Sequence, residues 1–376
     1  MSLPTILTTA TEIADFAVEL AEHETIAVDL EADSMHNYQE KVCLLQFTTS
    51  EQTILIDPLE LSDLEVLKPI FSNPDQRKIF HAADYDIRSL GRDFGISVSG
   101  LFDTMISCQF LGEERFGLAD VLKKYYGVEL NKRFQRADWS LRPLSDDMIR
   151  YAAEDTRYLH DLACLLEDKL VEKGRLEWVK EECELLEQVR FSSQQGPLFL
   201  RFKGAGSLKP RQLAALENML EWRDDEARRR NTPHYKVLGN KPLFELARLL
   251  PEGRNQLEGI DGLPSRLAGR YGGVLLQQIG QALELAEEQL PIYPRSIRKE
   301  VDPAVEDRMK ALKKWRAKKA AELQLDPGVL INNALLETLA THNPEDVDEL
   351  AGLELLKRWQ QQVLATGILA TLKRVS

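Results

Sequence analysis

A weak internal repeat in the C-terminal half limits what this chain can fold into more than any other feature. The segment LEWRDDEARRRN (220–231) matches LKKWRAKKAAEL (312–323), with one tryptophan on the other. VLGNKPLFELA (237–247) then matches VLINNALLETLA (329–340). The offset between the copies stays at 92 or 93 residues, and the apolar spacing is helical almost throughout. We therefore predict two copies of a small helical domain.

The N-terminal half has a different periodicity, because short β-rich runs come before its helices. Runs at 24–32, 41–49 and 52–58 are separated by turn-length polar segments and predict a three-stranded meander. A further strand is expected at 77–83. Helices are expected near 63–72, 84–95, 103–112 and 117–126, and from about 146 to 173. This pattern predicts an α/β domain with a mixed sheet flanked by helices.

Two breaks divide the chain. The first, at 192–210, is rich in Gly, Pro and Ser, and the second, at 287–303, contains three prolines. We expect three domains as a result, at residues 1–195, 205–290 and 303–376. The first is expected to be α/β, and the other two are expected to be all-α.

Charge is distributed unevenly between the two halves. The 376 residues have a net charge of −13. Residues 1–190 carry 37 acidic and 20 basic side chains, a net of −17, whereas 191–376 carry 24 and 28, a net of +4. This asymmetry fits a metal-dependent site joined to a module that holds nucleic acid, although a solvated acidic surface has the same composition.

Other bulk features predict a cytoplasmic protein. No apolar run approaches the roughly 20 residues that span a bilayer, and the N-terminus lacks a secretion-signal pattern. The four cysteines form no CxxC pair, so we expect reduced, mostly buried thiols. No stretch has the GxxxxGK[ST] spacing, which argues against a nucleotide-driven motor.

Two acidic segments indicate a catalytic site. AVDLEAD places Asp29 and Glu31 on one face of an expected central strand. The two carboxylates repel each other unless a cation lies between them, although a solvated strand end explains them equally well. HAADYDIRSL (81–90) places Asp84 and Asp86 where a strand leads into a helix. Asp84 has the alternative role of capping that helix.

A third segment adds a tyrosine. In YAAEDTRYL, Tyr151 and Asp155 lie one helical turn apart and face the same way. Alone, such a pair is commonly a packed ring beside a solvated carboxylate. Together with Asp29, Glu31 and Asp86, Asp155 offers oxygen ligands that suit two Mg²⁺ or Mn²⁺ ions. Two such ions, about 4 Å apart, stabilise the attacking and leaving oxygens of phosphoryl transfer, and the Tyr151 hydroxyl would orient the attacking water.

Two basic clusters are weaker candidates for contacts with phosphates. One precedes the third acidic segment and consists of Lys132, Arg133 and Arg136. The other lies in DRMKALKKWRAKK (307–319) and consists of Arg308, Lys310, Lys313, Lys314 and Lys318. A solvated surface is the alternative for both clusters. The repeat places the tryptophan of the second cluster in a domain core.

These segments resemble the ribonuclease D family, in the DEDD superfamily of 3′→5′ exonucleases. The motifs D-x-E, H-x-x-x-x-D and Y-x-x-x-D appear in that order, and the second selects Asp86 over Asp84. They correspond to Asp29 and Glu31, His81 and Asp86, and Tyr151 and Asp155. The run 134–159 resembles the D-W-x-x-R-P-L block of ribonuclease D. The two repeats resemble HRDC domains, which are helical nucleic-acid-binding modules, and 32–46 is closer to nuclear exosome-associated relatives.

The resemblance implies an RNase H-like first domain and removal of nucleoside 5′-monophosphates from the 3′ end of RNA. Precursors of tRNA and other stable RNAs are the implied substrates, and a monomer without membrane contact is implied. The four acids would bind two divalent ions, Mg²⁺ or Mn²⁺, with Tyr151 positioning the water. Further candidates for substrate contact are Leu30 and His81, which lie within the motifs, and Gln46, the last residue of 32–46.

Two other functions are compatible with parts of the pattern. A DNA 3′→5′ exonuclease of the same superfamily would have the same acids, since discrimination depends on contacts with the 2′-hydroxyl. A non-catalytic RNA-binding scaffold is the second alternative. The intact set of four acids and a tyrosine argues against the scaffold, because a scaffold has no need of clustered carboxylates.

Overall fold

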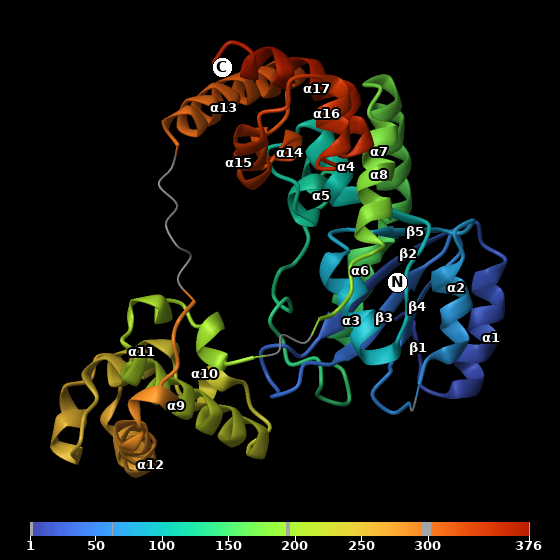
Figure 1. Cartoon of the computed structure of the whole chain (residues 1–376). Coiled ribbons are helices and arrows are strands. Elements are labelled where there is room, and N and C mark those ends of the chain that lie inside the picture. Colours follow the sequence, from blue (N-terminus) through green and yellow to red (C-terminus); the bar gives the residue numbers. More distant parts are fainter. Residues whose placement is uncertain (1–2, 62, 193–195, 295–301, 376) are drawn as a thin grey trace. The chain divides into compact units, whose positions relative to one another are not determined.

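The computed structural model describes residues 3–61, 63–192, 196–294 and 302–375 (Figure 1). The chain forms two compact units. The first unit contains residues 1–32, 42–191 and 299–376, and the second contains residues 33–41 and 192–298. None of the described helices is both long and apolar enough to cross a membrane.

A six-stranded mixed sheet forms the centre of the first unit, in the order β1-β4-β3-β2-β5-β6. Its strands are β1 (Thr5–Leu7), β2 (Thr25–Ala32), β3 (Val42–Thr48), β4 (Thr53–Ile56), β5 (Arg77–Phe80) and β6 (Leu101–Asp103). The antiparallel pairs β2–β3 and β3–β4 confirm the predicted meander, and the other pairs are parallel. The edge strands β1 and β6 were not predicted, because three residues are too few to show a period.

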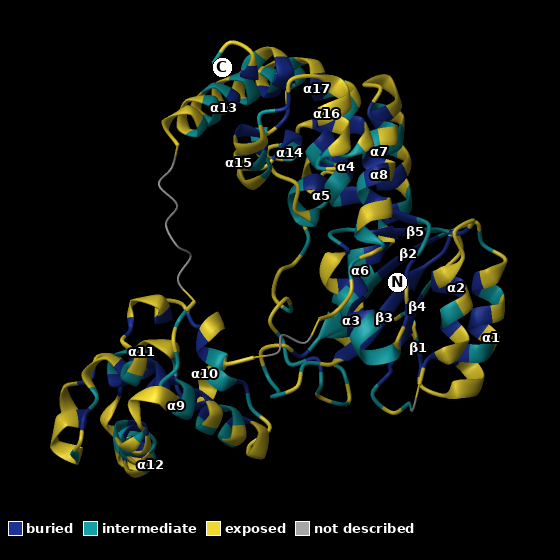
Figure 2. Ribbon diagram, viewed as in Figure 1, coloured by how far each residue is buried: buried dark blue, intermediate teal, exposed yellow. Residues whose placement is uncertain are grey.

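In the described part of the N-terminal region, eight α-helices belong to the first unit. They are α1 (Ala10–Ala21), α2 (Lys68–Ser72), α3 (Asp84–Phe94), α4 (Thr104–Leu111), α5 (Leu118–Tyr126), α6 (Asp146–Arg157), α7 (Leu159–Glu172) and α8 (Leu176–Leu186). The sheet they flank is largely buried (Figure 2). The prediction of one helix from 146 to 173 is wrong, because the chain turns at Tyr158 between α6 and α7. No proline or glycine marks this turn in the sequence.

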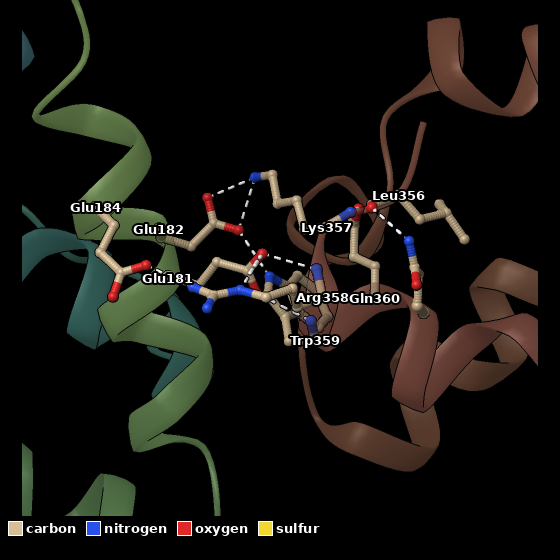
Figure 3. A network of polar contacts seen from close by, with 9 residues as sticks. Glu181, Glu182, Glu184, Leu356, Lys357, Arg358, Trp359 and Gln360 are labelled. Carbon is tan, nitrogen blue, oxygen red and sulfur yellow. Dashed lines mark hydrogen bonds and ion pairs between the residues drawn. The ribbon is translucent and has the colours of Figure 1, made fainter. Parts of the chain in front are cut away.

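The second repeat completes the first unit. It consists of α13 (Pro303–Leu323), α14 (Pro327–Leu330), α15 (Asn333–His342), α16 (Val347–Gly352) and α17 (Arg358–Leu372). Its contact with α8 is the polar network in Figure 3, where Glu181 accepts hydrogen bonds from the backbone N–H groups of Arg358 (2.7 Å) and Trp359 (2.9 Å). The indole of Trp359 stacks on Trp178 with ring centroids 5.0 Å apart. The second repeat is therefore part of the body that holds the sheet.

The first repeat forms the second unit, with α9 (Pro210–Arg229), α10 (His234–Val237), α11 (Asn240–Leu249) and α12 (Ser265–Glu284). Residues 33–41 pack against it, and the Tyr38 hydroxyl lies 2.9 Å from a carboxylate oxygen of Asp224. One arginine in each repeat makes an equivalent contact, and it is buried in the first repeat and half-buried in the second. Arg223 donates to the carbonyl of Leu238 (3.0 Å), and its counterpart Arg316 donates to the carbonyl of Ile331 (2.7 Å). The predicted repeat is confirmed, and Trp315 packs against Gly367 as predicted for a core residue.

Candidate active site

Strand β2 positions the first two acids. It lies between β3 and β5, so the prediction of a central strand is confirmed. Asp29 and Glu31 share one face, whereas Leu30 points to the other and is only 6% exposed within the apolar core. The side chain of Leu30 is therefore not among the acids, and the predicted substrate contact by this side chain is wrong.

Helix α6 brings the third acid to the same face. It packs across β2, β3 and β4. Carboxylate oxygens of Asp29, Glu31 and Asp155 all lie within 4.8 Å of one another. The Tyr151 hydroxyl, one turn earlier on α6, donates a hydrogen bond to Asp155. The packing of α6 on the sheet thus brings Asp155 beside Asp29 and Glu31, although more than 120 residues separate them in the sequence.

The fourth acid, Asp86, lies in the first turn of α3 and is buried. Its oxygens are outside the group that meets within 4.8 Å, although its charge acts on both Asp29 and Glu31. Asp84 does not cap α3 through its side chain, because Ala83 is the N-cap residue and Asp84 pairs with Arg88 at 3.0 Å. The capping alternative for Asp84 is wrong, and Asp86 is the residue that faces the other acids.

Burial and mutual repulsion disfavour the charged forms of these acids. Burial, followed by the charges of Asp86 and Asp155, raises the pKa of Asp29 well above its usual range. Burial and the neighbouring carboxylates do the same to the pKa of Glu31. Burial raises the pKa of Asp155 to about 7 and that of Asp86 to about 8. A bound divalent cation would offset this repulsion and favour the ionised carboxylates.

The donor set fits divalent metal ions with oxygen ligands. Carboxylates are the ligands that Mg²⁺ and Mn²⁺ prefer, and no cysteine belongs to the cluster of three acids. His81 is not a member either: its Nδ1 lies 2.9 Å from the Thr104 hydroxyl, and burial lowers its pKa. His81 is thus a hydrogen-bonded structural residue, and its contact with substrate stays a prediction.

The turn between β5 and α3 depends on a residue that was not predicted. Asp103, at the end of β6, is fully buried and accepts hydrogen bonds from the backbone of Ala82 (3.2 Å) and Ala83 (2.8 Å). It also caps α4 by accepting from the backbone of Met105 (2.8 Å). Ala82 has a φ of 71°, which a residue with a side chain rarely adopts without such support. A signal existed in the sequence, since an Asp directly before a helix is a common cap.

Two aromatic rings hold Tyr151 in place, and neither was predicted. Phe134 lies edge-on to the Tyr151 ring, with ring centroids 5.9 Å apart. The ring of the buried Trp139 is tilted against the Tyr151 ring, with centroids 6.0 Å apart. The segment carrying both rings is fixed by Arg142, which donates to Asp57 (2.7 Å) and to the carbonyls of Cys43 and Trp139 (2.8 Å each). These contacts explain part of the D-W-x-x-R-P-L resemblance.

The predicted phosphate contacts beside the acids are exposed. Lys132, Tyr151 and Asp155 line one small cavity of about 120 Å³. Arg133 is exposed with its guanidinium 5.2 Å from the centre of the Phe134 ring, and Arg136 is also exposed. Gln46 differs from them, because it is fully buried and cannot contact RNA in this structure.

The second basic cluster follows the outer side of α13. Lys310, Lys313, Lys314 and Lys318 are exposed there. Arg308 differs from these exposed lysines, because its Nε donates a hydrogen bond to the carbonyl of Ala340 (2.7 Å) in a partly buried contact. The lysines at 310, 314 and 318 recur every fourth residue and form one stripe, which we call the α13 lysine stripe.

Comparisons with known proteins find relatives of both the N-terminal α/β domain and the two helical repeats. A family model described as "3'-5' exonuclease" matches residues 4–171, and one described as "HRDC domain" matches residues 212–279 and 305–372. A ribonuclease D of Pseudomonas paraeruginosa is 27% identical over 353 residues, covering 93% of this chain and 92% of the relative.

Two solved structures are also similar. Ribonuclease D of Escherichia coli, described as an exoribonuclease involved in structured RNA processing, has a TM-score of 0.75 and 26% identity. The match covers 100% of this chain and 99% of that one. The catalytic core of RRP6 from Trypanosoma brucei has a TM-score of 0.65 and 30% identity, over 74% of this chain and 79% of that one.

The fold and the acidic site together define a 3′→5′ exonuclease with HRDC domains. Its relatives include ribonucleases D and a protein of Arabidopsis thaliana described as RRP6-like 1, of which the match covers 40%. The chain belongs to the ribonuclease D family and is an exoribonuclease, a hydrolase of phosphodiester bonds in RNA.

Proposed function

We propose that this exoribonuclease removes 3′-terminal nucleotides from RNA by hydrolysis at two divalent metal ions. The observation that supports this most directly is the meeting of Asp29, Glu31 and Asp155 within 4.8 Å, with the Tyr151 hydroxyl bonded to Asp155. Bound Mg²⁺ or Mn²⁺ ions would supply a lowered pKa for the attacking water and neutralise charge on the departing 3′ oxygen. Asp29, Glu31, Asp86 and Asp155 are the residues that would hold them.

Tyr151 has the role of orienting the water. Burial, followed by the charge of Asp155, raises the pKa of the Tyr151 hydroxyl above its ordinary value. The phenol therefore keeps its proton and remains a hydrogen-bond donor at neutral pH. Phe134 and Trp139 restrict the ring, so the hydroxyl is held in one position before RNA arrives.

The α13 lysine stripe is proposed to hold the RNA body through its phosphates, with Lys132, Arg133 and Arg136 contacting phosphates nearer the acids. We propose 3′ processing of tRNA and other stable-RNA precursors as the role. The E. coli relative, which is described as acting on structured RNA, supports this choice. A monomer acting in the cytoplasm is part of the proposal, and the cysteines of the described chain, none of which forms a disulfide, fit a reducing compartment.

The test uses 5′-labelled single-stranded RNA and DNA of one sequence, each with a free 3′-hydroxyl. The protein is incubated with Mg²⁺ or Mn²⁺, or with EDTA, beside the variants Asp155→Asn and Asp84→Asn. Asp84→Asn is the matched control, because Asp84 is an exposed acid two residues before Asp86 that pairs with Arg88. We expect a metal-dependent ladder that shortens from the 3′ end of RNA, unchanged in Asp84→Asn and absent in Asp155→Asn.

Each alternative has its own outcome. Equal shortening of the DNA would replace the RNA-specific function with that of a general 3′ exonuclease. Retention of RNA in a gel shift without any shortening would support the non-catalytic scaffold and contradict the proposal. Shortening that continues in EDTA would contradict the metal-dependent mechanism.

A further inference from the structure

Gln46 is a fully buried residue whose side-chain amide has no hydrogen-bond partner. It lies on β3 with none of its surface exposed. Neither its Nε2 nor its Oε1 has a partner among the described residues. An amide buried without a partner is destabilising, and in native structures such a group commonly has a reason to be there.

The neighbours of Gln46 in the sheet identify which polar group its amide can reach. Gln46 is paired directly with Asp29 on β2 and with Leu55 on β4. Side chains of directly opposed residues project from the same face with Cβ atoms about 5 Å apart. On the side of Leu55 there is only an aliphatic chain. On the other side is the Asp29 carboxylate.

Helix α6 closes the space above Gln46. Thr48, two residues further along β3 and on the same face, has its hydroxyl 2.7 Å from the hydroxyl of Thr156 on α6. The same Thr48 hydroxyl lies 2.8 Å from that of Thr53, so it is already engaged twice. Gln46 is thus covered by α6, the helix that carries Asp155, and lies between Leu55 and Asp29 across three neighbouring strands. Its amide is buried beside Asp29 and is not on the surface that RNA can reach.

We propose that Gln46 is a positioning residue for Asp29, donating a hydrogen bond from Nε2 to the Asp29 carboxylate when that carboxylate binds a divalent cation. The proposal rests on the proposed metal-dependent function. A carboxylate has more acceptor positions than one cation uses, and its orientation becomes fixed when a donor occupies one that remains. Asp29 is opposite Gln46 whether or not a cation is present, so the donor is held ready by the sheet register.

This role predicts opposite effects on stability and on metal affinity. Gln46→Met keeps an unbranched chain of similar length but removes the amide. Without the unpaired amide, the metal-free variant is expected to be at least as stable as the wild type. Its affinity for Mn²⁺ is expected to fall about 10–100-fold, the range seen when a hydrogen-bond partner of a metal ligand is removed. A residue with a merely structural role would not separate these two properties.

The experiment measures Mn²⁺ binding by electron paramagnetic resonance without RNA, and thermal unfolding in EDTA. Steady-state kinetics on RNA follow, where we expect kcat to fall and KM to stay within about twofold, because Gln46 lies away from the RNA surface. Leu55→Met is the matched control, since Leu55 is equally buried on the other side of Gln46 and offers no donor. It should leave Mn²⁺ affinity unchanged.

Mn²⁺ affinity in Gln46→Met equal to that of the wild type would overturn the proposal. If Gln46→Met unfolds, Gln46→Leu is measured by the same criterion. Failure of the wild type itself to bind Mn²⁺ or shorten RNA would contradict the proposed function. An active, metal-binding wild type beside an unaffected variant would contradict only the role of Gln46.

Discussion

The two helical repeats have the same internal framework but opposite charges on their first long helix. Lys310, Lys314 and Lys318 form the stripe on α13. The residues 93 positions earlier, on α9, are Glu217, Glu221 and Asp225. Glu217 even has a structural task, because it accepts hydrogen bonds from the backbone of Leu198 (2.7 Å) and Phe199 (2.8 Å). By charge, the α13 face suits RNA phosphates and its α9 counterpart does not.

The repeats differ again at the start of their last long helix. In the second repeat this position holds Trp359, which is 2% exposed and packs against Trp178. The residue 93 positions earlier is Arg266, which is exposed on α12. Glu181 and the neighbouring Glu182 complete the contact, with Glu182 accepting from the indole N–H of Trp359 at 2.8 Å. Trp359 and the two glutamates of α8 therefore explain why the second repeat belongs to the first unit.

The largest expected effect is on catalysis, in a variant that should still bind RNA. Asp155→Asn removes a carboxylate from the cluster and is expected to lower kcat at least about a thousandfold, because losing even a partner of a metal ligand costs 10–100-fold. RNA retention should remain, since the lysine stripe is unchanged. Quenched-flow or gel kinetics and a gel shift at one salt concentration measure the two properties. Parallel loss of both would mean that the acids, and not the second repeat, dominate RNA holding.

The next prediction compares the equivalent positions Trp359 and Arg266 in their effect on stability. Trp359→Ala is expected to lower the free energy of unfolding by about 3–5 kcal/mol, the range for removing a buried tryptophan. Arg266→Ala, at the equivalent exposed position, should change it by less than about 0.5 kcal/mol. Urea titrations followed by circular dichroism compare the two. Similar losses in both variants would contradict the distinction between the buried position of Trp359 and the exposed position of Arg266.

The stability of the first unit, which contains the acidic cluster and the second repeat, should depend on pH. Asp155 and Asp86 have pKa values of about 7 and 8 in the folded chain, above those of unfolded carboxylates. The folded state then binds more protons, so this stabilisation is fully present below about pH 4 and is lost as pH rises through 7 to 8. We expect the melting temperature in EDTA to fall between pH 5 and pH 8, because the free energy of unfolding decreases as these two acids lose their protons.

Mn²⁺ should reverse this trend, because a cation favours the ionised acids. In Asp155→Asn the fall with pH should be smaller than in the wild type, since one of the two groups no longer titrates. A melting temperature in EDTA that rises from pH 5 to pH 8 would show that the acids are not held in this way.

The smallest expected effect concerns the lysine stripe. Replacing Lys310, Lys314 and Lys318 by Gln is expected to weaken RNA binding about tenfold and to reduce the slope of log affinity against log salt by about 2, at roughly 0.7 per contact with a single strand. Fluorescence anisotropy over a salt series measures it. The control is Glu221→Gln with Asp225→Gln on α9, which should not weaken binding. An unchanged slope in the lysine variant would remove the stripe from the RNA-binding surface.

Much of the site was predictable because it depends on local periods. Alternation along a strand puts Asp29 and Glu31 on one face, and helical spacing puts Tyr151 one turn from Asp155. The motif resemblance selected Asp86 over Asp84. The supports of the site were less predictable. The cap pattern of Asp103 indicates its role at α4 but not its bonds to Ala82 and Ala83, and no local pattern reports the contacts of Trp139 with Tyr151 or of Arg142 with Cys43.

Residue type and short-range spacing were enough to predict the repeated helical module, the acidic character of the first half and the candidate acids of the site. Three other features became visible only in the folded chain. They are the placement of α6 across the sheet, the docking of the second repeat through Trp359, and the burial of Gln46 opposite Asp29. Each of these depends on strand register or on helix packing, which bring together residues that are far apart in the chain.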